Sequence, residues 1–254
     1  MTGWLEGLTA IITGASAGIG RSAALIFARE GANAVLAARR AKEGEEAAKM
    51  VRSAGGSALF VRTDVSDSAD VRKLVETCMD RFGALHCAFN NAGIADSPHV
   101  PTDGLEEADW DRVIGVNLKG TWLCKKHEIP RMIESGGGSI VNNASIFGSV
   151  GASYGAPYVA SNHGVLGLTK TAALEYARQG VRINAICPGY IPTPLVDRLA
   201  SANPDHIPDA IRAEPIGRRG TPEEAAEATA WLCSDRSSFV TGHALAVDGG
   251  FLAR

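Results

Sequence analysis

The stretch Thr13-Gly14-Ala15-Ser16-Ala17-Gly18-Ile19-Gly20 decides the fold that this sequence predicts. It follows an apolar run at residues 8–13, which is typical of a buried strand, and leads into residues 19–30, whose apolar positions repeat with a helical period. Glycines permit a tight turn and a close approach of the backbone to a ligand. Because the next helix begins with unpaired N–H groups, this order of elements favours a bound pyrophosphate.

The turn therefore predicts a dinucleotide site. Its candidate contacts share this one segment and are Gly14, Ser16, Gly18, Ile19 and Gly20. The alternative interpretation is a glycine-rich connection between a strand and a helix that binds nothing.

Arg39 and Arg40 follow the second predicted strand, close to the position where an acidic residue accepts hydrogen bonds from the 2′-hydroxyl of an adenosine ribose. No acidic residue stands there. A guanidinium at this position can instead bind a 2′-phosphate with charge-assisted hydrogen bonds of about 1.5–3 kcal/mol each. The two arginines favour NADP(H) over NAD(H), and the alternative is that both are solvated charges at the start of a helix.

Short apolar runs alternate with helix-length segments along the rest of the chain, which is the pattern of strands joined by helical crossovers. The predicted strands are residues 8–13, 34–38, 58–61, 85–90, 139–142, 181–186 and 244–247. Nearly continuous apolar strands are expected where helices cover both faces of a parallel sheet. The sequence predicts an α/β fold with a Rossmann-like, doubly wound sheet of seven parallel strands.

The composition is that of an ordinary globular protein. The chain has 254 residues, 45% of them hydrophobic and 21% charged, and no linker or repeat divides it. We therefore expect one domain over residues 1–254, with a substrate lid at about residues 188–219, where proline and glycine are frequent. The 25 basic and 28 acidic residues leave a net charge of −3, which predicts no nucleic-acid partner.

Cysteine usage and the N-terminal segment suggest a reduced compartment. The five cysteines are scattered, without spacing suited to a metal site, and no carboxylate or histidine cluster predicts a metal. No export signal and no long apolar run is present, so we expect a cytoplasmic protein without a membrane partner.

With these landmarks the chain resembles the short-chain dehydrogenase/reductase family, near glucose dehydrogenases and 3-oxoacyl-carrier reductases. The order and spacing of the motifs carry the resemblance: the glycine turn, Asp64-Val65, Asn90-Asn91-Ala92-Gly93, Asn117, Ser145, Tyr158, Pro188-Gly189 and Val247-Asp248-Gly249-Gly250. The resemblance implies a nicotinamide-dependent oxidoreductase that forms a homotetramer through helices near residues 109–134 and 158–178. It also implies cofactor contacts at Asp64, Val65, Asn91, Gly93, Tyr158, residue 162, Pro188, Gly189, Ile191 and Thr193.

Ser145 and Tyr158 fit the chemistry of carbonyl reduction. Hydride transfer to a carbonyl places negative charge on its oxygen, so the site needs a hydrogen-bond donor and a proton source close to that oxygen. Ser145 would polarise the carbonyl, and Tyr158 would deliver the proton, or remove it from an alcohol. By resemblance, Asn117 would hold a water in a proton relay.

Position 162 departs from the family pattern, because Asn162 stands where the family has a lysine one helical turn after Tyr158. A tyrosine with a pKa of about 10 needs a nearby cation to exchange protons readily at neutral pH. Asparagine carries no charge, although its amide can still bond ribose hydroxyls. Three explanations stay open: altered proton delivery in an active enzyme, a naturally impaired dinucleotide-binding protein, and a laboratory substitution.

The residues around the catalytic pair and the lid indicate the substrate. They are mostly apolar or aromatic and predict a neutral or hydrophobic carbonyl, imine or alcohol. The candidate substrate contacts, besides Ser145, are Ile94, Phe147, Tyr154, Tyr190 and Leu195. The alternative function is a non-catalytic dinucleotide-binding protein with a role in sensing or assembly.

Overall fold

The computed structural model describes residues 3–95, 98, 100–197 and 212–254. Within them the chain forms a sheet in the order β3-β2-β1-β4-β5-β6-β7, and every neighbouring pair is parallel. The strands are β1 (Thr9–Thr13), β2 (Asn33–Ala38), β3 (Ser57–Arg62), β4 (Cys87–Asn90), β5 (Gly138–Asn143), β6 (Val181–Pro188) and β7 (Ala244–Val247).

The predicted sheet of seven parallel strands is confirmed. The central strands are buried on both faces, and their side chains alternate between two hydrophobic cores. In β1, Ala10 and Ile12 lie in one core, whereas Ile11 lies in the other. Burial on both faces is the reason that these strands read as apolar runs instead of alternating patterns.

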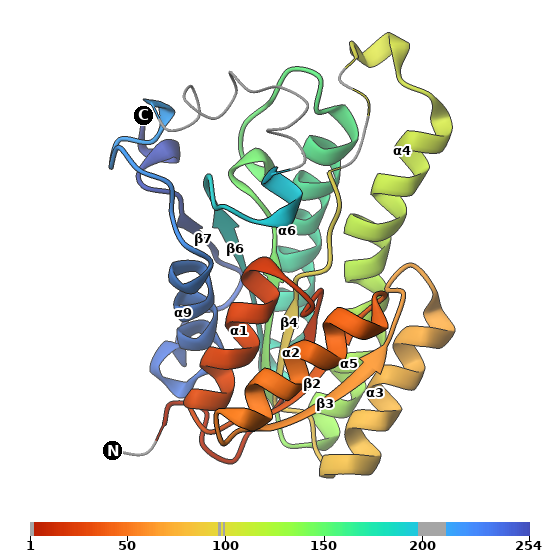
Figure 1. Cartoon of the computed structure of the whole chain (residues 1–254), viewed down its shortest axis with the longest axis vertical. Helices are drawn as coiled ribbons and strands as arrows, with labels where there is room; N and C mark the ends of the chain where they lie inside the picture. Colours follow the sequence, from red (N-terminus) through yellow and green to blue (C-terminus); the bar gives the residue numbers. More distant parts are fainter. Residues whose placement is uncertain (1–2, 96–97, 99, 198–211) are drawn as a thin grey trace.

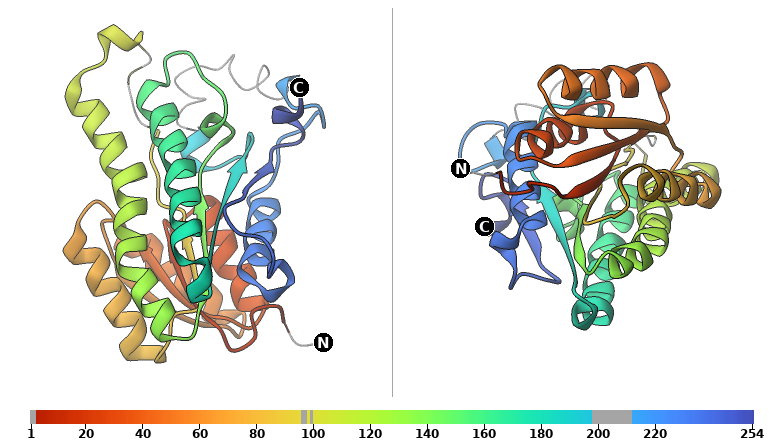
Figure 2. Two further views of the ribbon diagram at one scale, coloured as in Figure 1. Left: turned by 180° about the vertical axis from the view of Figure 1, so that it is seen from behind. Right: turned by 90° about the horizontal axis from the view of Figure 1, so that it is seen from below.

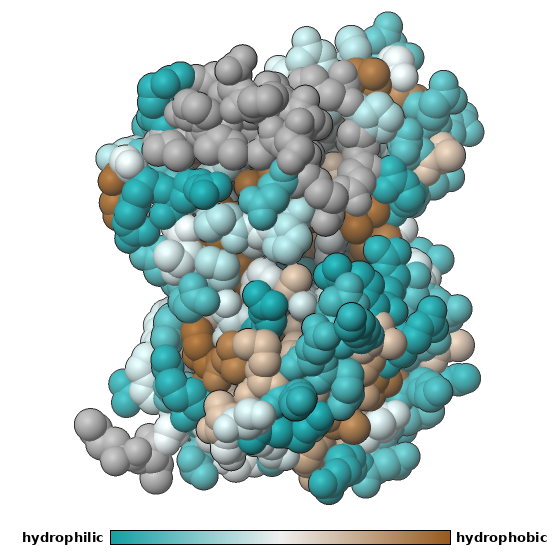
Figure 3. Space-filling model, viewed as in Figure 1, coloured by the Kyte–Doolittle hydropathy of each residue, from teal (hydrophilic) through white to brown (hydrophobic). Residues whose placement is uncertain are grey.

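Helices cover both faces of the sheet (Figures 1 and 2). One core is closed by α1 (Gly18–Arg29), α2 (Ala41–Ser53) and α9 (Pro222–Cys233). The other is closed by α3 (Ser68–Phe82), α5 (Gly120–Glu134) and α6 (Ala156–Tyr176). On the face seen in Figure 3, hydrophilic side chains dominate around α3, as expected for an amphipathic helix that turns its apolar side to the core.

A long helical segment runs from α4 (Glu107–Ile114) into α5 without a break. The sequence indicates an interruption near Gly115, but the chain widens there into one π-helical stretch, Gly115–Lys119, with helical backbone on both sides. π-Helical turns inside α-helices are frequent at functional sites. Single 3₁₀ turns complete the described elements: Thr102–Gly104, Ile146–Gly148, Ala177–Gln179, Asp235–Ser237 and Phe251–Ala253.

The strand order reverses between β1 and β4, which are neighbours in the sheet but far apart in the sequence. In open α/β sheets a crevice forms at such a reversal, outside the carboxyl ends of the strands. The candidate site residues at the ends of β1, β4 and β5 therefore come to one edge. The predicted lid at 188–219 is described only at its two ends, since residues 198–211 lie outside the described residues.

Candidate active site

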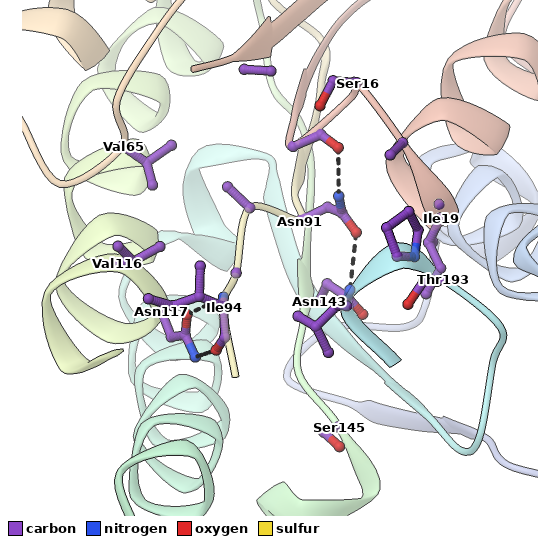
Figure 4. Close-up of a pocket in the computed structure, with 18 of the residues that line it drawn as sticks. Ser16, Ile19, Val65, Asn91, Ile94, Val116, Asn117, Asn143, Ser145 and Thr193 are labelled. Carbon is purple, nitrogen blue, oxygen red and sulfur yellow. Dashed lines mark hydrogen bonds between the residues drawn. The ribbon is translucent and has the colours of Figure 1, made fainter. Parts of the chain in front are cut away.

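A cleft of about 460 Å³ lies along the carboxyl edge of the sheet. The glycine turn forms part of its lining, together with Ser145, which lies two residues after β5 (Figure 4). Tyr158, from α6, also lines the cleft. The structure brings most of the predicted site residues onto this lining: Gly14, Ser16, Gly18, Ile19, Arg39, Arg40, Asp64, Val65, Asn91, Gly93, Ile94, Asn117, Ser145, Tyr158, Asn162, Pro188, Gly189, Ile191, Thr193 and Leu195.

Four predicted residues are not on this lining: Gly20, Phe147, Tyr154 and Tyr190. A Cβ on Gly20 would lie 2.5 Å from the Asn91 Nδ2 atom, so this glycine permits close packing behind the turn. The Phe147 ring packs edge-on against Phe251, with 6.4 Å between ring centroids. Tyr154 is 48% exposed and has a positive φ of 63°. Closeness in the sequence to Ser145 or Tyr158 did not predict whether a side chain points into the cleft.

The geometry of the turn fits a phosphate-bearing cofactor. Gly14 and Gly18 have φ values of +65° and +54°, a conformation that favours glycine. A Cβ on Gly14 would lie 2.7 Å from Asn91 Nδ2, and one on Gly18 would lie 3.0 Å from Thr193 Cγ2, so side chains there would fill the cradle. The N-terminus of α1 has no side-chain cap and no acidic residue in its first turn, so its N–H groups are available to an anion.

Two asparagines join the turn to the catalytic end of the cleft. Asn91 Nδ2 donates to the carbonyl oxygen of Thr13 at 3.0 Å. Asn143 Nδ2 donates to Asn91 Oδ1 at 3.0 Å (Figure 4). Asn143 lines the cleft, but the sequence analysis missed it because it continues a strand of buried residues. Its place at the end of a strand, two residues before Ser145, is the signal that would have found it.

The charged residues of the lining lie at the carboxyl ends of β2 and β3. Arg40 donates to Ser16 Oγ at 3.3 Å and pairs with Glu43 at 3.3 Å. Arg39 makes no hydrogen bond or ion pair with another described residue, so its guanidinium is available to a ligand. Burial raises the pKa of Asp64, but hydrogen bonds from Ser66 and the nearby Arg39 outweigh burial and leave that pKa below its ordinary value.

Tyr158 is at the opposite end from these charges. Burial raises the pKa of Tyr158 above its ordinary value, and side-chain hydrogen bonds with Ser145 and Asn162 offset part of the increase. Asn162 also donates its Nδ2 to the backbone carbonyl of Tyr158 at 2.9 Å. Of the described residues that line the cleft, only Arg39, Arg40 and Asp64 carry a charge, and the neighbour of Tyr158 one helical turn on is the uncharged Asn162.

Asn117 has a clear structural role in the π-helical stretch. Its Oδ1 accepts from the Ile94 N–H at 2.9 Å, and its Nδ2 donates to the Ile94 carbonyl at 2.8 Å and to Ser161 Oγ at 3.2 Å. The Ser161 hydroxyl donates to the Tyr158 carbonyl at 2.8 Å. Asn117 therefore joins the loop after β4 to the helix that carries Tyr158. Lys119, the lysine two residues after Asn117, is exposed and is not part of the cleft lining.

The described residues contain no group of three or more His, Cys, Asp or Glu side chains arranged to hold a metal. None of their helices combines the length and the apolar character needed to cross a membrane. All five cysteines are buried free thiols.

Comparisons with known proteins agree with this geometry. The family model described as "Enoyl-(Acyl carrier protein) reductase" matches residues 14–252. A cyclohexanol dehydrogenase from Acinetobacter sp. (strain SE19) is 42% identical over 245 residues, which cover 96% of this chain and 95% of that protein.

Two solved structures are similar over nearly the whole chain. Levodione reductase has a TM-score of 0.93 at 36% identity and covers 98% of this chain and 99% of its own. A protein from Beutenbergia cavernae, solved with NADP at low occupancy, has a TM-score of 0.92 at 36% identity, with 98% of both chains covered. The motifs, the fold, the cleft and these matches agree, and the chain belongs to the short-chain dehydrogenase/reductase family.

Proposed function

We propose that the protein is an NADP(H)-dependent oxidoreductase that interconverts a secondary alcohol and a carbonyl, or reduces an imine, with Tyr158 transferring the proton. The observation that carries the proposal is that Ser145 and Tyr158 line the same cleft as the glycine turn. The nicotinamide, when bound, supplies or accepts the hydride. The glycine turn, the first turn of α1 and Asn91 would hold the dinucleotide.

The catalytic pair has distinct tasks in this proposal. In reduction, the Ser145 hydroxyl donates a hydrogen bond to the substrate oxygen and so stabilises the negative charge that develops there. Tyr158 donates its phenolic proton to that oxygen as the carbon receives hydride. In oxidation the proton returns to Tyr158, which must first be deprotonated. Asn117 would keep Tyr158 in place through Ser161.

Arg39 supports the preference for NADP(H). Its side chain is exposed, lies on the cleft lining near Asp64, and makes no hydrogen bond or ion pair within 4 Å with another described residue. A 2′-phosphate on the adenosine ribose would supply such an ion pair. Arg40 is already shared between Ser16 and Glu43 and would contribute less.

The substrate in this proposal is neutral and moderately hydrophobic. Ile94 and Leu195 line the cleft, and the lining near Tyr158 has uncharged side chains. The similarity to a cyclohexanol dehydrogenase favours cyclic secondary alcohols and the matching ketones as first substrates.

Asn162 supports a second candidate function, a dinucleotide-binding protein with little or no catalysis. The cleft provides the contacts for binding, whereas the raised pKa of Tyr158 disfavours proton transfer. An active enzyme with slow or unusual proton delivery remains our first proposal because Ser145 and Tyr158 are both in place.

The experiment measures absorbance of the reduced nicotinamide with cyclic ketones, imines and secondary alcohols, beside direct titration with NADPH and NADH. Turnover that is lost in Tyr158→Phe supports the oxidoreductase. Binding of NADPH without turnover on any substrate favours the second function. If neither dinucleotide binds at millimolar concentration, both proposals fail.

We also propose a homotetramer in the cytoplasm. The outer sides of the long helices expose large apolar side chains, namely Trp110, Trp122 and Leu174, which a symmetric interface would cover. Buried free thiols at all five cysteines support a reducing compartment. Light scattering that gives the mass of one chain at micromolar concentration would contradict the tetramer.

A further inference from the structure

The cleft wall formed by residues 188–191 is held from behind by one buried acidic residue. Pro188, Gly189 and Ile191 line the cleft, while Tyr190 between them does not. The backbone of Tyr190 is fixed on both sides. Its N–H donates to Glu214 Oε1, and its carbonyl accepts from the Gly220 N–H at 3.1 Å.

Glu214 is itself anchored in a rigid setting. Its side chain is only 3% exposed, and its own carbonyl accepts from the Gly217 N–H at 2.8 Å. The Ile216 N–H donates to the Gly249 carbonyl oxygen at 3.0 Å, which fixes the segment that contains Glu214 beside the C-terminal end of the chain (Figure 1). Glu214 therefore joins the downstream end of the predicted lid to the wall of the cleft.

The contact between Glu214 and this wall is close. A Cβ built on Gly189 would lie 2.5 Å from Glu214 Oε1 and 2.8 Å from Asp248 Cα. No side chain fits at position 189, so the glycine backbone packs directly on the carboxylate. A shift of the Glu214 carboxylate would consequently shift Gly189, which lines the cleft.

The charge at this position is costly to the fold. Glu214 Oε2 is buried and has no hydrogen-bond partner among the described residues. Burial raises the pKa of Glu214 above its ordinary value and Asp248 adds to the increase, while the hydrogen bond from Tyr190 and the nearby Arg218 offset only part of it. Asp248 offers no compensating donor, because its carboxylate already accepts from Gly250 at 2.9 Å and Leu252 at 2.8 Å. A residue needed only for packing would avoid this cost.

Residues 188–191 follow β6 beside the end of β5 that leads to Ser145, which is where the reacting nicotinamide would lie. We propose that Glu214 is a positioning residue, whose acceptor oxygen fixes residues 188–191 so that they hold the nicotinamide half of the dinucleotide. This inference rests on the proposed function. The proposal requires only a hydrogen-bond acceptor at the position of Oε1, because the Tyr190 N–H needs an acceptor and not a negative charge. Glutamine should therefore replace Glu214, whereas an apolar residue should not.

The test compares Glu214→Leu and Glu214→Gln in the full chain. The probes are NADPH and adenosine 2′,5′-bisphosphate, which contains only the adenosine half. We expect the leucine variant to bind NADPH about 10-fold more weakly and adenosine 2′,5′-bisphosphate within twofold of the unmodified chain. The glutamine variant should bind both within about threefold. Glu224→Leu is the matched control, because it disrupts the same segment at Arg218 and Thr221 without touching Tyr190.

Several outcomes would overturn the proposal. These are unchanged NADPH binding in the leucine variant, equal weakening of both probes, and equal loss in the leucine and glutamine variants. If Glu214→Leu does not fold, Glu214→Ala and the glutamine variant make the same comparison. An unmodified chain that binds neither probe would contradict the proposed function itself, whereas a failure confined to the variants concerns Glu214 alone.

Discussion

At the scale of single residues, we expect Asn162 to limit the proton transfer that Tyr158 can perform. Its amide reaches the Tyr158 carbonyl and the Tyr158 side chain, but it brings no charge. A unit charge about 4 Å away at an effective dielectric of about 20 is worth roughly 4 kcal/mol, which is an upper limit on the lost stabilisation of the phenolate. Binding of the dinucleotide depends on other contacts, so turnover and binding are expected to separate.

We predict that Asn162→Lys raises the rate of alcohol oxidation at neutral pH by about 10- to 100-fold. Oxidation needs the phenolate of Tyr158, and burial holds the pKa of Tyr158 above its ordinary value. The rate of the unmodified chain should therefore keep rising with pH into the alkaline range. A lysine favours the phenolate, so the variant should reach its plateau at lower pH. Initial rates across pH measure both effects.

His163→Lys is the control for this variant, because it adds a lysine on the same helix at an exposed position outside the cleft lining. It should leave the pH profile unchanged. Equal rates and equal profiles for the Asn162→Lys chain and the unmodified chain would mean that position 162 does not control proton transfer.

Arg39 carries the prediction on cofactor preference. Arg39→Ala should weaken NADPH binding by about 10- to 100-fold and change NADH binding less than threefold, because only NADPH has the 2′-phosphate. Fluorescence titration with each dinucleotide measures the two constants. Arg52→Ala is the control, since Arg52 pairs with Glu45 on the same helix and is not part of the cleft lining. A parallel loss of both dinucleotides in Arg39→Ala would refute the assignment.

Sequence reasoning found most site residues because their roles depend on strand ends and on backbone conformation. Gly14 and Asn91 directly follow predicted strands, and Asp64 and Ser145 lie three residues beyond the ends of theirs. Asn143 and Glu214 were missed for a different reason. Their roles depend on contacts with Asn91 and Tyr190, which the fold brings near them from distant segments.

At the scale of elements, the proposed dinucleotide site depends on the backbone conformation of the glycine turn between β1 and α1. Gly14 combines a positive φ with two close neighbours, Asn91 and Ala92. Position 14 therefore favours glycine for two reasons: its φ is positive, and there is no room for a Cβ atom. The π-helical stretch was not predicted, since a single glycine in a helical pattern does not tell a widened turn from a break.

We predict that Gly14→Ala abolishes measurable dinucleotide binding, that is, weakens it about 100-fold or more, because its Cβ would displace Asn91 and narrow the turn. Isothermal titration with NADPH measures the loss. Gly55→Ala is the matched control: Gly55 has a similar positive φ of 87°, and nothing lies within 4 Å of its added Cβ. It should cost about 1 kcal/mol of stability and leave binding intact. Normal binding in Gly14→Ala would contradict the assigned role of the turn.

At the scale of the whole molecule, the sheet was predictable because burial on both faces demands apolar strands joined by helical crossovers. The position of the cleft then followed from the strand order, which reverses between β1 and β4. The sequence did not predict that charged side chains of α5 are buried, which destabilises the fold. Lys125 and Glu128 are 3% and 0% exposed, and neither Lys125 Nζ nor Glu128 Oε1 has a hydrogen-bond partner among the described residues.

This buried pair on α5 predicts a stabilising substitution. Burial lowers the pKa of Lys125 to about 8 and raises the pKa of Glu128 to about 7. At pH 7 the fold therefore holds an ammonium group in an unfavourable setting. We predict that the double substitution Lys125→Met with Glu128→Gln raises the free energy of unfolding at pH 7 by about 1–2 kcal/mol, measured by urea denaturation, because it removes both buried charges and leaves neither without its partner. Lys126→Met, at the exposed neighbouring position, should change it by less than about 0.5 kcal/mol.

The pH dependence of this gain identifies its cause. The pKa of Lys125 is about 8 in the folded chain and 10.5 by its ordinary value, so below pH 8 both states hold the proton and the penalty is complete. Between pH 8 and 10.5 the folded lysine is neutral while the unfolded one is still charged, so the penalty falls as pH rises. The advantage of the double variant should therefore shrink over this range, since Glu128 is already ionised in both states above pH 8. An advantage that stays constant to pH 10.5 would show that the substitutions stabilise the core by packing alone.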